Sequence, residues 1–228
     1  LALRVRARAW RTRIGWAVLA AVVSGAVLVP WVAYNLSRFE EPVYISQNLG
    51  GTIAGSYCPT VFGGPLLGYW DFNCPIAAFE ASGLPEGSPE SDAAIREVGL
   101  TYLKENLDRL PVVVAARLGR IVGVYQPTQQ RDLDALTEGV SSWVATAGMI
   151  TLPFMLVGSA AGGVVLWRRG RVVFPLVAPI ACVLVTVVVF YAATRFRSTA
   201  EGPICVLVAV ALDAVWNRTP WGPSAPSD

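Results

Sequence analysis

The stretch VVFPLVAPIACVLVTVVVFYAATRFRSTAEGPICVLVAVAL, residues 172–212, places two arginines between two apolar runs. Neither run, 172–194 or 202–212, contains a charged side chain. A helix needs about 20 apolar residues to cross the roughly 30 Å hydrocarbon core of a bilayer. Arg195 and Arg197 therefore fall in a short turn where the chain leaves a hydrocarbon layer, and the sequence raises the question of what two permanent charges do there.

The rest of the chain shares this apolar character. Of its 228 residues 54% are hydrophobic and 15% are charged, whereas a soluble domain carries about 25% charged residues. Two further windows without charge, 14–37 and 139–167, are also long enough to span a bilayer. We therefore predict an all-α integral membrane protein with about four transmembrane helices. They are expected at 14–37, 139–167, 172–194 and 202–217.

The arginines predict how these helices are oriented. Five arginines lie in the first 13 residues and three lie in the short hairpin 168–171, so the positive-inside rule makes both segments cytoplasmic. Residues 38–138, with 7 basic and 13 acidic residues, and the turn 195–201 are then extracytoplasmic. Arg195 and Arg197 thus depart from the rule. The basic segment 1–13 and the tail 218–228 are expected in the cytoplasm, and the missing initial methionine suggests the C-terminal part of a longer protein.

The segment 38–138 is too long for a connection without its own structure. Residues 40–90 show no helical period, and we expect turns and short extended pieces there. Amphipathic helices are predicted near 89–107, where a serine precedes a proline, and near 111–125, between two prolines. The second is too short to span. It suits the membrane surface, with its arginines at headgroup height, although a buried helix is the alternative.

The four cysteines divide by location. Cys58 and Cys74 lie in the extracytoplasmic segment, where disulfides form. We predict a bridge between them, which would stabilise the fold by about 3 kcal/mol. Cys182 and Cys205 lie within predicted helices and are interpreted as small buried hydrophobic residues.

The composition excludes several kinds of chemistry. The chain has no histidine, so histidine-activated nucleophiles and imidazole metal sites are excluded. It also has no glycine-rich nucleotide loop and no CxxC pair. The small residues at 158–163 indicate close contact between helices. Asp71, in GYWDFNC, lies among aromatic residues where a carboxylate could face a sugar; it is the one catalytic candidate, and capping of a turn is its alternative role.

Arginines are the main candidates for binding. A guanidinium offers a planar fork of donors that suits a phosphate, and it keeps its charge in apolar surroundings. The alternative is ordinary anchoring at lipid headgroups or pairing with nearby glutamates such as Glu201. We expect five arginines to form a lipid-phosphate site at the outer membrane boundary: Arg38, Arg117, Arg120, Arg195 and Arg197.

Four stretches of the sequence form a recognisable set: YNLSRFEEPVYISQNLG (34–50), the stretch from Cys58 to Cys74, VVVAARLGRIVGVYQP (112–127) and TRFRSTAEGPICVLVAVAL (194–212). Together they resemble the C-terminal half of bacterial membrane glycosyltransferases of the GT-C superfamily. They are similar to glycosyltransferase family 39, which includes protein O-mannosyltransferases and aminoarabinose transferases. The resemblance runs from about Pro30 to Leu212.

This resemblance implies an enzyme of the bacterial plasma membrane that takes a sugar from a polyprenyl-phosphate carrier. The acceptor would be a protein, lipid or glycan on the outer side. In that family the catalytic carboxylate belongs to the N-terminal half, so this part would bind the carrier phosphate and be inactive alone. The resemblance specifies neither the sugar nor a divalent metal. Membrane lipids are expected partners and nucleic acid is not; a transporter subunit or a ligand-binding receptor is the non-enzymatic alternative.

Overall fold

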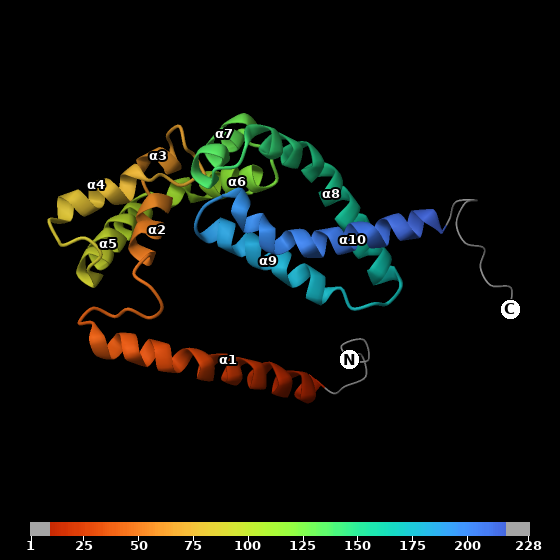
Figure 1. The fold of residues 1–228 in the computed structure, drawn as a ribbon, viewed down its shortest axis with the longest axis horizontal. Coiled ribbons are helices and arrows are strands. Elements are labelled where there is room, and N and C mark those ends of the chain that lie inside the picture. Colours follow the sequence, from red (N-terminus) through yellow and green to blue (C-terminus); the bar gives the residue numbers. More distant parts are fainter. Residues whose placement is uncertain (1–9, 218–228) are drawn as a thin grey trace. The chain divides into compact units, whose positions relative to one another are not determined.

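The computed structural model describes residues 10–217, of which 77% are helical and none forms a strand. The predicted cytoplasmic tail 218–228 and most of the segment 1–13 lie outside the described residues. Figure 1 shows the elements in chain order. They are α1 (Trp10–Arg38), α2 (Leu49–Ser56), α3 (Pro59–Phe62), α4 (Asn73–Ser82), α5 (Pro89–Glu105), η2 (Leu107–Arg109), α6 (Leu110–Ile121), α7 (Pro127–Glu138), α8 (Ser142–Arg168), α9 (Phe174–Val189), η3 (Thr194–Arg197) and α10 (Ser198–Trp216).

Three of the described helices are long and apolar enough to cross a bilayer. They are Ile14–Arg38, Ser142–Arg168 and Thr194–Trp216. The apolar helix α9 has 16 residues and is shorter. Their apolar side chains are largely uncovered by protein, as at Val27, which is 73% exposed. The chain is therefore a helical, membrane-associated protein.

The chain divides into two compact units. Unit 1 combines Leu1–Thr60 with Asp71–Leu107, and unit 2 combines Val61–Trp70 with Asp108–Asp228. Each unit therefore includes a piece of chain that is separated in sequence from the rest of it.

Unit 1 packs α2, α4 and α5 around a small core of Ala54, Ala78 and Ile95. The approach of α5 to α2 is close, because a Cβ on Gly99 would lie 2.8 Å from the Cα of Ala54. Helix α5 begins as the sequence predicts: the Oγ of Ser88 accepts a hydrogen bond from the backbone N–H of Ser91.

The prediction of turns and extended pieces over 40–90 is wrong. The structure has three helices there, α2, α3 and α4. Five of the eight residues of α2 are buried, and a helix covered on most sides has no polar face to produce a helical period. Small residues such as Gly50 and Gly51 also lower the apparent helix propensity, which packing against α5 overrides.

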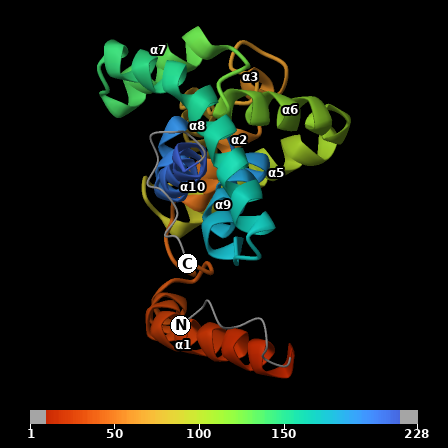
Figure 2. The same cartoon turned by 90° about the vertical axis from the view of Figure 1, so that its right-hand side faces the viewer.

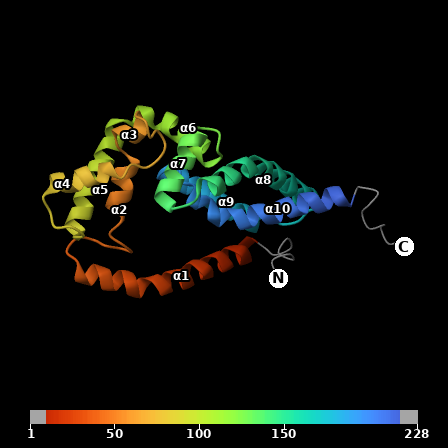
Figure 3. The ribbon, with the colours of Figure 1, turned by 45° about the horizontal axis from the view of Figure 1, so that its top comes forward.

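In unit 2, α10 packs against both α8 and α9 (Figure 3). Helices α8 and α10 run in the same direction: the first turns of both line one cleft, and Arg169 near the end of α8 is 3.7 Å from Asp213 of α10. In Figure 2 α10 is seen nearly end-on, with α8 and α9 next to it. Between the two ends, a Cβ on Gly162 would collide with the carbonyl of Leu207, so the small residues at 158–163 do permit close helix contact.

Several helices begin or end at other residues than the sequence predicts. Helix α9 ends at Val189 rather than at 194, and the predicted turn 195–201 is a 3-10 turn, η3, followed at once by α10 from Ser198. Gly123, with φ 78°, turns the chain after α6, so this helix ends at Ile121 rather than at 125. Cys182 and Cys205 are exposed instead of buried, because the outward faces of α9 and α10 have no protein cover.

Candidate functional site

A cleft of about 420 Å³ lies over η3 in unit 2. The last turns of α7, the first turns of α8, η3 and the start of α10 all line it. The part from α8 is apolar and includes Val144 and Met149. The charged side chains in the lining are Arg131, Asp134, Glu138, Arg195, Arg197 and Glu201, three positive and three negative. We call this hollow the RFR cleft, after Arg195-Phe196-Arg197.

Arg195 stands at the exposed side of the RFR cleft. Its Nη1 forms an ion pair with Oε1 of Glu138 at 3.1 Å, and its Nη2 donates to the hydroxyl of Tyr191. The guanidinium also lies 5.6 Å from the ring centroid of Phe196. An exposed ion pair of this kind contributes about 0–1 kcal/mol to the free energy of unfolding. An anionic ligand that binds Arg195 more strongly could therefore replace the glutamate.

Arg197 lies deeper and is half-buried. Among the described residues its side chain makes no hydrogen bond and no ion pair within 4.0 Å, and its Nε is fully buried. The nearest acidic charges are Asp134 and Glu201. A guanidinium removed from water without acceptors is costly, so this side chain is poised for an anion in the RFR cleft.

Asp134 lies on α7 and lines the RFR cleft together with Thr194 of η3. Its carboxylate accepts a hydrogen bond from Nε2 of Gln130 at 3.0 Å. The residue is 6% exposed. Burial raises the pKa of Asp134, and the hydrogen bond from Gln130 and the charge of Arg197 oppose that rise.

The two arginines of α6 do not line the RFR cleft. Arg117 is fully buried, and its Nη1 donates to the carbonyl of Val188 at 2.8 Å and to that of Val189 at 3.2 Å. These are the last carbonyls of α9, which lack partners within the helix. Arg117 therefore caps α9 and interacts favourably with the negative end of its dipole.

Arg120, 1% exposed, is held by a different set of acceptors. Its Nε donates to the carbonyl of Leu67 at 2.7 Å, and its Nη atoms donate to the side chains of Gln129 and Gln130. The prediction that Arg117 and Arg120 lie at headgroup height is thus wrong: α6 is the buried helix of the alternative interpretation. A membrane-surface helix and a buried helix share one amphipathic pattern, and only the packing distinguishes them.

Arg38 belongs to unit 1, at the end of α1. It is exposed, its Nη1 donates to the hydroxyl of Tyr34 at 2.6 Å, and its guanidinium lies 5.9 Å from the ring centroid of Phe39. All of these partners are within one turn of the chain. Of the four predicted arginines in unit 2, Arg195 and Arg197 line one cleft, and Arg117 and Arg120 do not line it.

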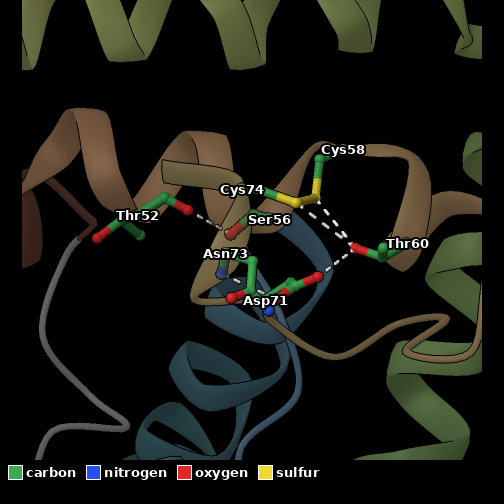
Figure 4. The surroundings of a disulfide bond; sticks show 7 residues. All are labelled: Thr52, Ser56, Cys58, Thr60, Asp71, Asn73 and Cys74. Carbon is green, nitrogen blue, oxygen red and sulfur yellow. Dashed lines mark hydrogen bonds between the residues drawn. A yellow bond between two sulfur atoms is a disulfide. The ribbon is translucent and has the colours of Figure 1, made fainter. Parts of the chain in front are cut away.

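Asp71 has the capping role in unit 1. It is 5% exposed and accepts hydrogen bonds from Oγ1 of Thr60 at 2.7 Å and from the backbone and side-chain nitrogens of Asn73, at the start of α4 (Figure 4). The structure joins Cys58 and Cys74 by a disulfide beside it, the pair that the sequence predicts. Asp71 and the two sulfurs are close enough for a metal, but disulfide sulfurs are not thiolate ligands.

Helix α7, which supplies two carboxylates of the cleft, is not among the helices predicted from the sequence. Its signals are present: Pro127 at the first turn, Gly139 with φ 66° after the last, and Gln130, Asp134 and Glu138 at spacings of four. Residues four apart share a helix face, so the polar face of α7 could have been found.

A scan against protein-family models, a search of curated proteins and a search of solved structures found no match to this chain. The fold and the site define a helical, membrane-associated protein with a charged cleft at the start of α10.

Proposed function

We propose that this chain is the carrier-binding, C-terminal part of a GT-C membrane glycosyltransferase. In this proposal the RFR cleft holds the phosphate of a polyprenyl-phosphate-linked sugar on the outer side of a bacterial plasma membrane. The observation that carries it is the half-buried guanidinium of Arg197, which has no hydrogen-bond acceptor among the described residues. A phosphate oxygen would supply that acceptor.

The lining of the cleft suits an amphipathic ligand. Arg195 and Arg197 stand on one side, and the apolar first turns of α8, with Val144 and Met149, stand on another. A phosphate carried on a prenyl chain has a charged head and an apolar tail, so both parts would meet a matching surface. A free anion would use only the arginines.

The shared direction of α8 and α10 supports four crossings of the bilayer by the chain. If α8 and α10 both span the bilayer in the same direction, the chain between them must return across it, and α9 is the one α-helix in that segment. Its 16 residues rise about 24 Å at 1.5 Å each. The non-helical residues 190–193 can add to this length, which makes the return feasible despite the short helix.

The proposed chemistry assigns a defined task to these residues. In transfer, the bond between the anomeric carbon and the phosphate oxygen breaks, and an acceptor oxygen bonds to that carbon. Negative charge then grows on the departing phosphate, and fixed guanidinium groups in a dry cleft stabilise it. The base that takes the acceptor proton would come from the N-terminal half. Arg117 and Arg120 hold the framework in this scheme and do not touch the phosphate.

The test uses membranes that contain the full-length protein and a radiolabelled prenyl-phosphate sugar. Changing Arg195 and Arg197 to glutamine should lower transfer by about 100-fold or more, the effect of removing transition-state donors. Arg169→Gln is the matched control, because Arg169 pairs with Asp213 at the other end of α8 and α10. Unchanged turnover in the double variant would overturn the proposal. Binding without transfer in the wild type would instead indicate a non-enzymatic receptor.

A further inference from the structure

A second cavity, of about 330 Å³, lies in unit 1. The connection between α1 and α2 forms one wall of this cavity, and the first two turns of α5 form another. We call it the linker pocket. It shares no lining residue with the RFR cleft, so an inference about it does not depend on the proposed function of that cleft.

Two opposite charges line the linker pocket without pairing. Arg96 of α5 and Glu41 of the connection are both half-buried. Within the described part of the chain, neither side chain makes a hydrogen bond or an ion pair within 4.0 Å. Charged groups that are partly removed from water gain free energy when they find partners. A ligand that carries both an anionic and a cationic group would supply a partner to each.

The third charged residue of the linker pocket, Asp92, already has a structural role. Its Oδ1 accepts a hydrogen bond at 2.7 Å from the backbone N–H of Gly50, in the first turn of α2, where N–H groups lack partners within the helix. Burial raises the pKa of Asp92, and this hydrogen bond and the charge of Arg96 oppose the rise. Glu41 is therefore the carboxylate that remains for a cationic group of the ligand.

The linker pocket adjoins the end of a helix that is long and apolar enough to span a bilayer. Nε1 of Trp31, on α1, donates to the carbonyl of Ile45 at 3.1 Å and holds this wall against the helix. Tyr44 and Ile45 line the pocket and are 61% and 63% exposed. Trp31 stacks on Tyr34, with ring centroids 6.1 Å apart, and such aromatic side chains at a helix end are typical of the headgroup level.

We propose that the linker pocket binds the headgroup of a zwitterionic membrane lipid, phosphatidylethanolamine. The guanidinium of Arg96 would bind the phosphate, because its planar fork of donors fits phosphate oxygens. The ammonium group, with its three N–H donors, would pair with Glu41. The exposed apolar side chains of the connection would contact the acyl chains, in continuity with the uncovered apolar surface of α1.

Other common phospholipids match this arrangement less well. Phosphatidylglycerol has a phosphate but no cation for Glu41. Phosphatidylcholine has a cation, but its quaternary ammonium group has no N–H to donate. The linker pocket should therefore select among headgroups that all contain the same phosphate.

The test measures which lipids remain bound to the full chain. The protein is released from nanodiscs that contain equal amounts of phosphatidylethanolamine, phosphatidylcholine and phosphatidylglycerol, and native mass spectrometry counts the lipids that remain. We expect phosphatidylethanolamine to be retained about tenfold more than either of the others, the effect of one charge-assisted hydrogen bond. Equal retention of the three lipids would overturn the proposal.

Two variants separate the two charges. Glu41→Gln should abolish the preference for phosphatidylethanolamine over phosphatidylglycerol and leave the retention of phosphatidylglycerol unchanged. Arg96→Gln should lower the retention of both lipids by about tenfold, because both carry a phosphate. Glu40→Gln and Lys104→Gln are the matched controls, since both residues are exposed and neither lines the pocket. An equal loss in a variant and its control would show that overall charge governs retention and would contradict a site.

A soluble competitor identifies the source of the headgroup. Glycerophosphoethanolamine has the same charged groups without acyl chains, so it should not displace the lipid at equal concentration. Displacement at equal concentration would assign the linker pocket to a soluble zwitterion instead. Ala93→Trp fills the pocket and should prevent the retention of phosphatidylethanolamine, with thermal unfolding as the check that the variant is folded. Full retention in the folded variant would place the lipid elsewhere, and the two glutamine variants decide the proposal if this variant does not fold.

Discussion

The two arginines of α6 and the two arginines of η3 have the same side chain but opposite surroundings. Arg117 and Arg120 are buried, and carbonyl and amide oxygens accept their hydrogen bonds. Arg195 is exposed in a replaceable ion pair, and Arg197 is half-buried without an acceptor among the described residues. The hydrogen bonds of the first pair stabilise the fold, and the second pair is available to a ligand. Burial alone therefore does not distinguish the two pairs; what separates Arg197 from Arg117 and Arg120 is that no part of its guanidinium meets a hydrogen-bond acceptor in the described part of the chain.

The largest effect on stability is expected when Arg117 is replaced with methionine. The carbonyls of Val188 and Val189 would lose their charged donor inside the core, so we expect a loss of about 2–4 kcal/mol in the free energy of unfolding. Denaturant titration in detergent micelles measures it. Arg131→Met, at the rim of the RFR cleft, is the control and should cost little. A loss below about 1 kcal/mol would mean that α9 does not depend on this cap.

A smaller effect is expected from the titration of Asp134. Burial raises its pKa above the ordinary 3.8, so the folded chain holds this proton more tightly than the unfolded chain does. The contribution of Asp134 to stability is therefore present below pH 3.8 and is lost as the pH rises through the raised pKa. Asp134→Asn should flatten that part of the pH dependence, measured by unfolding at a series of pH values. An unchanged slope would contradict the burial of this carboxylate.

The Arg195 ion pair should contribute still less. Glu138→Gln removes its partner in a largely solvated setting, and we expect about 0.2–1 kcal/mol in low salt. The difference from the wild type should disappear near 1 M salt, where the screening length is about 3 Å. A salt-independent loss would show that the pair is more buried than its exposure indicates.

The smallest change in stability is expected at Arg197. Methionine in its place removes a half-buried cation that has no hydrogen-bond acceptor in the described part of the chain, so the free energy of unfolding should stay within about 0.5 kcal/mol or rise. Geranyl phosphate should raise the melting temperature of the wild type and not that of Arg197→Met. A large loss of stability in this variant would place Arg197 with the arginines of α6 and remove the contrast.

Length and hydropathy predicted the helices whose patterns do not depend on neighbours. The apolar windows at 14–37 and 139–167 correspond to α1 and α8, and the serine cap places the start of α5. The short helix α2 could not be recognised, because five of its eight residues are buried and it has no polar face. The helix α7 could have been recognised from its proline, its glycine and its polar face.

The sequence could point to two arginines of the proposed site, but it could not show which other arginines lie outside it. The sequence singled out Arg195 and Arg197 because two charges interrupt an apolar stretch, which is a local property. It could not exclude Arg117 and Arg120, because their acceptors are carbonyls of Leu67, Val188 and Val189, distant in the chain. Every backbone carbonyl is identical in sequence terms, so only coordinates identify which ones a guanidinium meets.

The sequence by itself determined that this protein is helical and apolar enough for a membrane, and that two arginines stand at the start of its last apolar helix. These follow from composition and spacing, which each segment carries alone. Only the tertiary structure decided which arginines have hydrogen-bond acceptors, which carboxylates line the RFR cleft, and that α6 is buried. Those properties depend on partners that lie 53 to 71 residues away in the sequence, and packing selects such partners through contacts that no local pattern encodes.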